Sequence, residues 1–283
     1  MLGTNREDLI IQSVIGEIAS PTQKVGGYKV GFDGVARVLP GTGGITYNAR
    51  IGDSATRWVA DHVEPGVSIR NLSGKSNGAP ENMALNILSC IGNEARVVSG
   101  DGRGAKGRVT GMHGGIHNVM VDFEPEVLEQ LTIGDRIQIK AYGTGLRLLD
   151  FPEITVMNLD PGLLEVIDPQ VEGDSLVFPV THLVPAQIMG SGLGNVHAYA
   201  GDYDIQLFDE RITREFGLDT LRFGDFVAIT DAAHEFGRIY LEGAISIGVV
   251  VHSACILSGH GPGVTTVATS RSGKIRPEIS REA

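Results

Sequence analysis

The chain has 283 residues, 23 of them basic and 34 acidic, and its net charge of -11 comes with no run of consecutive lysines or arginines. This balance argues against nucleic acid as a partner, because phosphate backbones are bound by clustered basic side chains. The only cysteines, Cys90 and Cys255, are far apart, the N-terminus lacks an apolar signal core, and the longest apolar run (residues 244–251) is shorter than a membrane span. We therefore expect a cytoplasmic protein without disulfides and without membrane contact.

The first half of the chain contains glycine-rich strings that look like nucleotide sites but lack their context. Residues 27–40 alternate imperfectly between apolar and polar and predict a strand that enters a loop. That loop, GTGGITY at residues 41–47, lacks the Gly-Lys-Ser/Thr of a phosphate-binding loop. Gly102, Gly104 and Gly107 match the dinucleotide fingerprint, but the following RVTGMHGGI is β-branched and broken by glycine, so no helix opens there. The sequence predicts no nucleotide cofactor.

Helices are expected to be few and short. The run from Pro80, PENMALNILSCIGN, has apolar residues mainly at helical spacing, with Glu81 suited to the first turn and Gly92 to the end. Shorter helices are expected at 125–131 and 211–216. Apolar runs predict strands at 119–123, 137–142, 226–230 and 244–252, the last of them buried on both faces.

The string Leu-x-x-Gly-Asp, followed by a strand pattern, occurs at residues 131–135 and again at 221–225. Glycine and aspartate favour a turn in both copies, which suggests that each half contains its own small barrel or curled sheet. A polar turn with a proline at 150–152 marks the boundary between the halves. With 39 glycines dispersed among β-branched residues, the chain is predicted to be a β-rich α+β protein with domains at 1–150 and 151–283.

The stretch from Phe178 to Phe208 concentrates ionisable residues among turn-forming glycines. Beyond Gly201 the alternation predicts a strand with Asp202 and Asp204 on one face, roughly 6.6 Å apart. The glycines also let the chain bend so that His197 approaches Asp202. Two carboxylates with one or two imidazoles suit a divalent metal ion such as zinc, calcium or magnesium. In the alternative interpretation, these acids cap turns and lie in solvent.

Several other histidines are left open by the sequence. His62, near Glu64, is either an acid/base candidate or a surface residue. His113 and His117 have the i, i+4 spacing of two ligands on a helix, but the glycines between them disfavour a helix, so they are expected in a loop. His252 either forms hydrogen bonds in the core or reaches a site at the strand ends, and His260 lies in an irregular glycine-rich loop at 258–263.

Four segments resemble an uncharacterised prokaryotic family, domain of unknown function 4438. They are GTGGITYNARIGD, the loop at 107–117, LTIGDRIQIKAYG, and VVVHSACILSGHGPGVTT near the end of the chain. This resemblance implies an N-terminal OB-like small β-barrel domain and a C-terminal mixed α/β domain. It implies no activity.

A second resemblance is confined to residues 179–204. Pro-Val, Val-Pro-Ala and then Gly194-x-x-His197-Ala-x-x-Gly201-Asp202-x-Asp204 are similar to the pattern of the acetamidase/formamidase family, whose members hydrolyse small amides. Carried over by position, His197 and Asp202 match a histidine and an aspartate of that family, and Asp204 matches its final glutamate. Asn195 stands where that family has aspartate, and Tyr203 where it has glycine.

Two functional hypotheses follow. In the first, the C-terminal half is a metal-dependent hydrolase of a C–N (amide) bond in a small neutral or cationic molecule. His197 and Asp202 bind the metal, Asp204 is the general base, and His182 or His234 protonates the leaving amine. In the second, the protein is a non-catalytic small-molecule-binding or assembly protein. A small-molecule ligand and a homo-oligomer are expected in either case.

Overall fold

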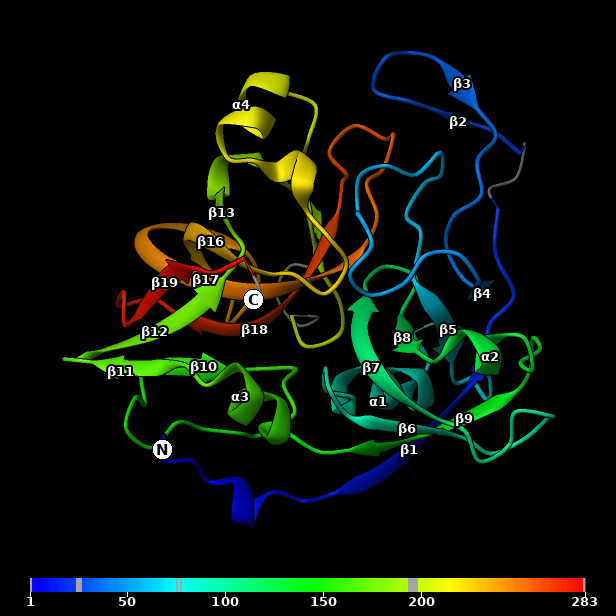
Figure 1. Ribbon diagram of the computed structural model, residues 1–283, viewed down its shortest axis with the longest axis horizontal. Helices are drawn as coiled ribbons and strands as arrows, with labels where there is room; N and C mark the ends of the chain where they lie inside the picture. Colours follow the sequence, from blue (N-terminus) through cyan, green and yellow to red (C-terminus); the bar gives the residue numbers. More distant parts are fainter. Residues whose placement is uncertain (1, 24–26, 75, 77, 193–197, 282) are drawn as a thin grey trace.

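The computed structural model describes residues 2–23, 27–74, 76, 78–192, 198–281 and 283, and within them the chain is rich in strands (Figure 1). The strands of the N-terminal half are β1 (Gln12–Ile18), β2 (Lys29–Val30), β3 (Ala36–Arg37), β4 (Ile45–Thr46), β5 (Gly66–Arg70), β6 (Glu94–Val97), β7 (Lys106–His113), β8 (Asn118–Asp122) and β9 (Arg136–Ala141). Its helices are η1 (Arg6–Asp8), α1 (Pro80–Leu88) and α2 (Pro125–Leu128).

Strands of the N-terminal half close into a barrel. In the described part of the chain they pair in the order β1-β9-β6-β7-β8-β5, and β5 pairs back onto β1, while β4 extends from β5. Helix α1 packs on β1 and β8 and buries Leu85. The expected β-barrel is therefore present. An OB-fold is a five-stranded Greek-key barrel, and the OB-like character expected for this barrel is not confirmed.

The C-terminal half contains β10 (Ile154–Val156), β11 (Gln170–Glu172), β12 (Ser175–Val180), β13 (His182–Pro185), β14 (Met189–Gly192), β15 (Tyr203–Ile205), β16 (Phe226–Ala233), β17 (Ile239–His252), β18 (Gly263–Ser270) and β19 (Ile275–Ile279). Its helices are α3 (Pro161–Ile167), α4 (Glu210–Glu215), η2 (Ala186–Ile188) and η4 (Leu218–Thr220). A curved sheet runs β13-β16-β17-β18-β15-β14, with β10 on β18, and a smaller sheet runs β11-β12-β19. Parallel pairs (β12–β19, β13–β16) occur beside antiparallel ones.

Several elements follow the sequence closely. Pro80 starts α1 as expected, but the helix ends at Leu88, before Gly92, because Ser89 already has extended backbone. Strand β17 is buried from Ala244 onward, as its continuous apolar pattern predicts. The string Gly102-x-Gly104-x-x-Gly107 leads into strand β7 and not into a helix, as the β-branched residues that follow it predict.

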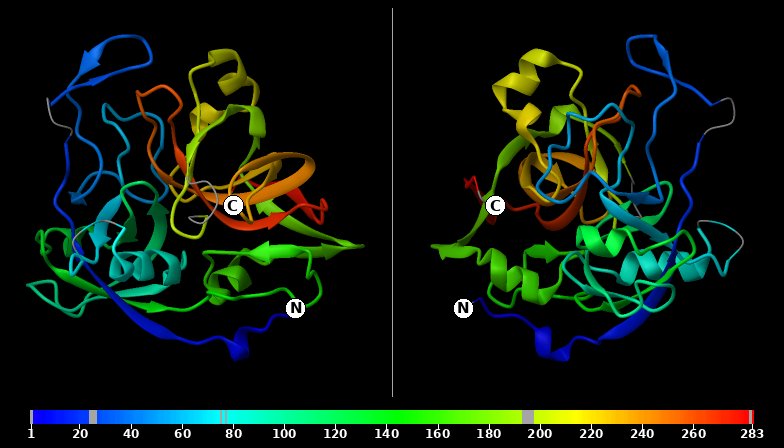
Figure 2. Two further views of the ribbon diagram at one scale, coloured as in Figure 1. Left: turned by 180° about the vertical axis from the view of Figure 1, so that it is seen from behind. Right: turned by 45° about the vertical axis from the view of Figure 1, so that its right-hand side comes forward.

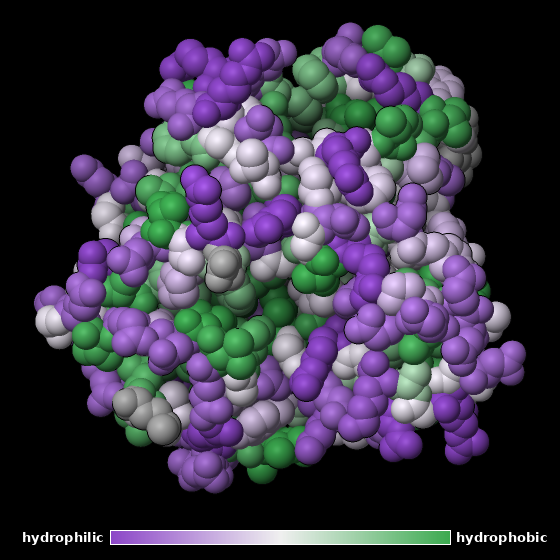
Figure 3. Space-filling view, viewed as in Figure 1, coloured by the Kyte–Doolittle hydropathy of each residue, from purple (hydrophilic) through white to green (hydrophobic). Residues whose placement is uncertain are grey.

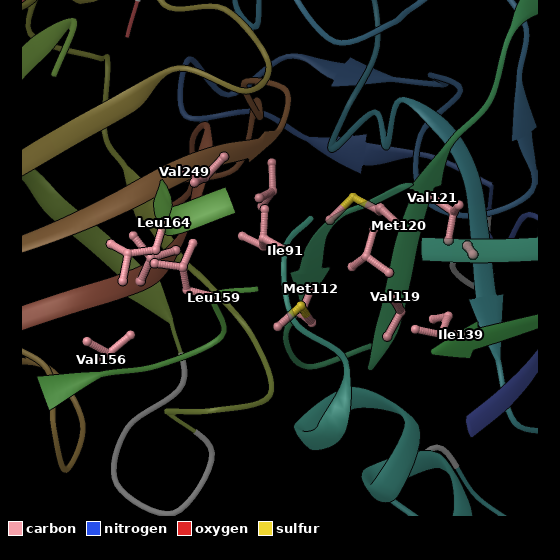
Figure 4. Packing of buried hydrophobic residues seen from close by; sticks show 14 of the residues in the cluster. Ile91, Met112, Val119, Met120, Val121, Ile139, Val156, Leu159, Leu164 and Val249 are labelled. Carbon is pink, nitrogen blue, oxygen red and sulfur yellow. The ribbon is translucent and has the colours of Figure 1, made fainter. Parts of the chain in front are cut away.

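The hydrophobic core is continuous across the predicted boundary at residues 150–152. One cluster contains barrel residues such as Met112 and Ile139 together with Leu164 and Val249 of the C-terminal half. In Figure 4, Ile91 lies between these two groups of side chains. Figure 2 shows the two halves side by side, with the N-terminal segment running beneath the C-terminal half before it enters the barrel.

The contact between β7 and the C-terminal sheet is close. A Cβ at Gly111 would lie 2.2 Å from Val251 Cγ1, so glycine is needed for the two strands to approach. Next to it, Thr265 Oγ1 donates a hydrogen bond of 3.1 Å to the Met112 carbonyl. The end of β7 is thereby fixed against the ends of β17 and β18.

The hairpin of β2 and β3 projects from the molecule (Figure 1, upper right), and hydrophobic side chains are exposed along it (Figure 3). Tyr28, Val30, Phe32 and Val38 are each more than half exposed. The homo-oligomer expected from the sequence stays a prediction. No helix in the described ranges is long and apolar enough to cross a membrane.

Candidate metal centre

A cavity of about 220 Å³ lies where the two halves meet. Its lining includes His62 and His113 from the N-terminal half and Asp202, Asp204 and His260 from the C-terminal half. His252 is fully buried directly beside Asp202, with 2.7 Å between Nε2 and Oδ2. Imidazole and carboxylate groups from five separate segments therefore converge at one point.

Strand ends supply most of these side chains. His113 ends β7, His252 ends β17, and Asp202 and Asp204 lie immediately before and within β15. Strand β15 pairs with β18, whose first residue, Gly263, lies opposite both Asp204 and His252. A Cβ at Gly263 would lie 2.2 Å from Asp202 Oδ2 and from His252 Nε2, so only glycine leaves room for that pair.

His62 reaches the cavity from a loop. Its backbone is in the left-handed region (φ 56), which is uncommon for a residue other than glycine. The conformation is held by the neighbouring strand end, because the Ser253 N–H donates to the Val63 carbonyl at 2.9 Å and the Val63 N–H donates to Ser253 Oγ at 2.8 Å. A strained backbone that is fixed by its surroundings often marks a functional residue.

Three of the buried residues, His113, Asp202 and His252, offer ligand atoms that all lie within 4.8 Å of one another. We call these residues the buried triad. The Gly114 N–H donates to Asp202 Oδ1 at 2.6 Å, which leaves Oδ2 directed at His252. The rings of His113 and His252 are 4.3 Å apart between centroids.

Next to the triad, His62, Cys255 and His260 also offer ligand atoms within 4.8 Å of one another. We call these residues the outer group, because His260 is partly exposed at the cavity. His62 Nε2 is 3.3 Å from His260 Nδ1. Asp204 lies between the two sets, with Oδ2 2.9 Å from His260 Nδ1 and Oδ1 3.4 Å from His252 Nε2.

Buried acceptors orient three of the imidazoles. Glu64 is 2.5 Å from His113 Nδ1, Asp61 is 3.3 Å from His62 Nδ1, and the Ser253 carbonyl is 3.0 Å from His252 Nδ1. When Nδ1 donates to such an acceptor, Nε2 is left as the ligand atom, and this is the usual arrangement around histidine-bound metals. In all three rings Nδ1 is thereby engaged, and Nε2 is the nitrogen that remains for a ligand.

The electrostatics favour a positive charge in the cluster. Burial disfavours the imidazolium, but the Asp202 carboxylate beside it raises the pKa of His252 to about 9. Burial likewise opposes ionisation of Asp202 and Glu64, yet His252 and His113 lower the pKa of these two carboxyl groups. For His62, burial lowers the pKa, and the nearby His252 and His113 add to that effect.

The structure places the residues that the sequence singled out in different regions. Asp202 and Asp204 lie together in the cavity. His197 is outside the described residues. His182 contacts Thr181 Oγ1 and Thr220 Oγ1 at 2.7 and 2.9 Å, and the buried His234 contacts Thr266 Oγ1 at 2.8 Å, so neither imidazole is among the groups that line the cavity.

Sequence reasoning did not assign the four histidines in or beside the cavity to the site, although it left open an acid/base role for His62 and a site contact for His252. The four are His62, His113, His252 and His260. The interpretation of His62 as a surface residue is wrong, since it is 8% exposed. The available signal was local: HSACILSGH places two histidines and Cys255 within nine positions, next to glycines that permit close packing. Their convergence with His62 and His113 depends on how the halves dock, which no local pattern encodes.

Comparison with known proteins places the chain in a family. The N-terminal and C-terminal models described as Domain of unknown function (DUF4438) match residues 28–165 and 166–283. The chain belongs to the DUF4438 family. Among solved structures, this DUF4438 chain is similar to the crystal structure of TM1086, with 46% identity, a TM-score of 0.93, and coverage of 100% of this chain and 97% of that one.

No curated protein matches the DUF4438 chain. The family description and the name of the solved structure state no activity. The resemblance to acetamidases and formamidases at residues 179–204 is not shown by these comparisons, so the activity that it implies stays a proposal.

Proposed function

We propose that this protein is a metal-dependent hydrolase that cleaves a C–N (amide) bond in a small molecule. The observation that carries the proposal is the buried triad, in which His113, Asp202 and His252 direct ligand atoms to one point beside a cavity. Two histidines and one carboxylate are the protein ligands of several hydrolytic zinc sites, which keep a fourth position for water or substrate.

The donor set favours zinc or a similar transition metal over calcium or magnesium. Imidazole suits zinc, copper, iron and nickel, whereas calcium and magnesium prefer oxygen ligands. The supporting contacts of Glu64 with His113 and of Ser253 with His252 have the form found around such metals. Of the metals expected from the sequence, zinc therefore fits the triad best.

A bound divalent ion polarises a carbonyl group and lowers the pKa of a water molecule. In the hydrolysis, the water oxygen bonds to the carbonyl carbon, the C–N bond breaks, and the amine nitrogen takes up a proton. Asp204, the general base expected from the sequence, is suitably placed for the proton of that water, because its Oδ1 is buried beside the triad and accepts no hydrogen bond from a described residue.

The cavity also limits the substrate. A volume of about 220 Å³ accommodates only a small molecule, and buried carboxylates at Asp202 and Asp204 disfavour an anionic one. A small neutral or cationic amide therefore fits the site. His260 is partly exposed at this cavity.

The test is metal content, measured by mass spectrometry on purified wild type, His113→Ala and Asp202→Asn. We expect near-stoichiometric metal in wild type, at least a tenfold loss in both variants, and release of amine from small amides only by the metal-containing protein. His197→Ala belongs in the same series, since the sequence predicts that residue as a ligand.

His182→Gln is the matched control, because it changes an imidazole that does not line the cavity. This variant should keep both metal and activity. Wild type that stays metal-free after incubation with zinc would refute the hydrolase and leave a non-catalytic binding protein as the better account.

A further inference from the structure

We infer that the cavity binds two divalent cations, one at the buried triad and one at the outer group of His62, Cys255 and His260, with Asp204 as a bridging ligand. This inference rests on the proposed function, because it extends the metal site from one ion to two. Nothing in the triad itself requires the second ion.

The outer group forms a three-residue ligand set of its own. Two imidazole nitrogens and a sulfur lie within 4.8 Å of one another, and none of these three residues belongs to the triad. The facing ring nitrogens of His62 and His260 are 3.3 Å apart. At the sulfur, the Leu257 N–H donates a hydrogen bond of 3.2 Å to Cys255 Sγ, and a thiol that coordinates a metal ion loses its proton on binding.

Asp204 lies between the triad and the outer group. Its two oxygens point in different directions, Oδ2 toward His260 of the outer group and Oδ1 toward His252 of the triad. The residue is 5% exposed, and Oδ1 accepts no hydrogen bond from the described residues. A buried carboxylate oxygen without a hydrogen bond is costly, and a cation on each side would satisfy both oxygens.

Each of the two sets has its own supporting carboxylate. Glu64 is fully buried and holds His113 of the triad, while it also accepts hydrogen bonds from Asn118 and Gly43. Asp61 is likewise fully buried and lies 3.3 Å from His62 Nδ1 of the outer group. It also accepts a hydrogen bond from the Ile256 N–H and forms an ion pair with Lys29. Two separately oriented imidazole sets are more than a single four-coordinate ion needs.

The chemistry of the donors indicates the kind of ions. Imidazole, thiolate and carboxylate together suit zinc or a comparable transition metal. Two-metal sites hold their ions about 3.5–4 Å apart, a spacing that one carboxylate spans. If both oxygens of Asp204 were ligands, this residue would not be the proton acceptor proposed above, and two bound cations would supply the lowering of the pKa of water in its place.

The experiment counts zinc per chain. Wild type, His260→Ala, Asp204→Asn and the control His182→Gln are incubated with excess zinc, freed of unbound metal by gel filtration, and measured by mass spectrometry, with circular dichroism to confirm that each is folded. We expect two zinc ions in wild type and in His182→Gln, and one in His260→Ala and in Asp204→Asn.

Other results separate the two levels of the proposal. One zinc in wild type, unchanged in His260→Ala, overturns the second site and leaves the single-ion hydrolase standing. Two zinc ions that persist in both His260→Ala and Asp204→Asn overturn the ligand assignment. No zinc in wild type overturns the inference together with the proposed function.

Discussion

The imidazole of His234 is fully buried on the C-terminal sheet, beside the ring of Tyr203 and away from the cavity. Its Nδ1 contacts Thr266 Oγ1, whereas no described residue forms a hydrogen bond with Nε2. Burial, with a smaller contribution from Arg238, lowers the pKa of His234 to about 3. At a pH near 6.5 the ring of His234 therefore stays neutral in the folded protein, whereas the same ring takes up a proton in the unfolded chain.

The lowered pKa of His234 makes the folded protein less stable in acid. Because the folded pKa lies below the ordinary value of 6.5, the unfolded state binds the proton first, and stability present above pH 6.5 is lost as the pH falls toward 3. Between pH 7.5 and pH 5 this single group should lower the free energy of unfolding by about 2 kcal/mol. Urea unfolding at both pH values should show that the free energy of unfolding falls by about 2 kcal/mol less in His234→Asn than in wild type.

Asparagine keeps a polar atom near the position of Nδ1 but does not titrate, so the comparison between the two pH values separates protonation from lost packing. Equal acid sensitivity in the two proteins would mean that His234 is accessible to protons in the folded state.

At the scale of single residues, the sequence predicted which side chains share a face of one strand better than it predicted contacts between side chains on different elements. Asp202 and Asp204 could be placed on a common face because a strand alternates with period two. The same reasoning named His62 and Glu64 but could not assign them to this site, because their partners are more than forty positions away in the chain. His234 entered the predicted site because its place at a strand end was visible, whereas its burial against Tyr203 was not.

Among the elements, a turn with Gly-Asp recurs with the same geometry. In Arg50–Asp53, Thr132–Asp135 and Arg222–Asp225 the aspartate Oδ2 accepts a hydrogen bond of 2.9 Å from the N–H three residues earlier. The preceding glycines have φ values of 92, 93 and 90. The sequence predicted the second and third turns from Leu-x-x-Gly-Asp, and the structure adds the first.

Gly134→Ala tests how much such a turn contributes. A Cβ at Gly134 would meet nothing within 4 Å, so the cost comes from the backbone conformation alone, which L-residues adopt at about 1–2 kcal/mol. We expect the free energy of unfolding to fall by that amount, which appears as a lower urea midpoint with an unchanged denaturant slope.

Gly78→Ala is the matched control, because its Cβ also meets nothing within 4 Å and its φ is not in the left-handed region. It should leave stability unchanged or slightly raise it. A loss as large as that of Gly134→Ala would show that the methyl group, and not the backbone, is responsible.

The local signals that succeeded at this scale are those with a short-range cause. Pro80 starts α1, and the apolar run at 244–252 forms the buried part of β17. The segment at 27–40 was expected to be one strand, but it forms a two-stranded hairpin, because Asp33 and Gly34 make a turn in its middle. Closure of the barrel by β1 and β5 joins residues about fifty positions apart, so no window of the sequence contains it.

At the scale of the whole molecule, the two halves share their core and their candidate site. Met112 and Val249 belong to one hydrophobic cluster, and Ala49 and Val63 of the N-terminal half pack in a second cluster with Val227. The cavity is likewise lined by side chains from both sides of residues 150–152. Cutting or loosening either half would therefore expose apolar surface in the other.

This shared core predicts cooperative unfolding. Trp58, the single tryptophan, packs against the second cluster, so its fluorescence reports on that cluster, while far-ultraviolet circular dichroism reports on the strands of both halves. In urea, the two signals should give the same midpoint. Because bound ions would contact both halves, a chelator should shift both curves together to lower urea. Separate midpoints would show that each half is stable alone, and a chelator shift in only one signal would place the ions within one half.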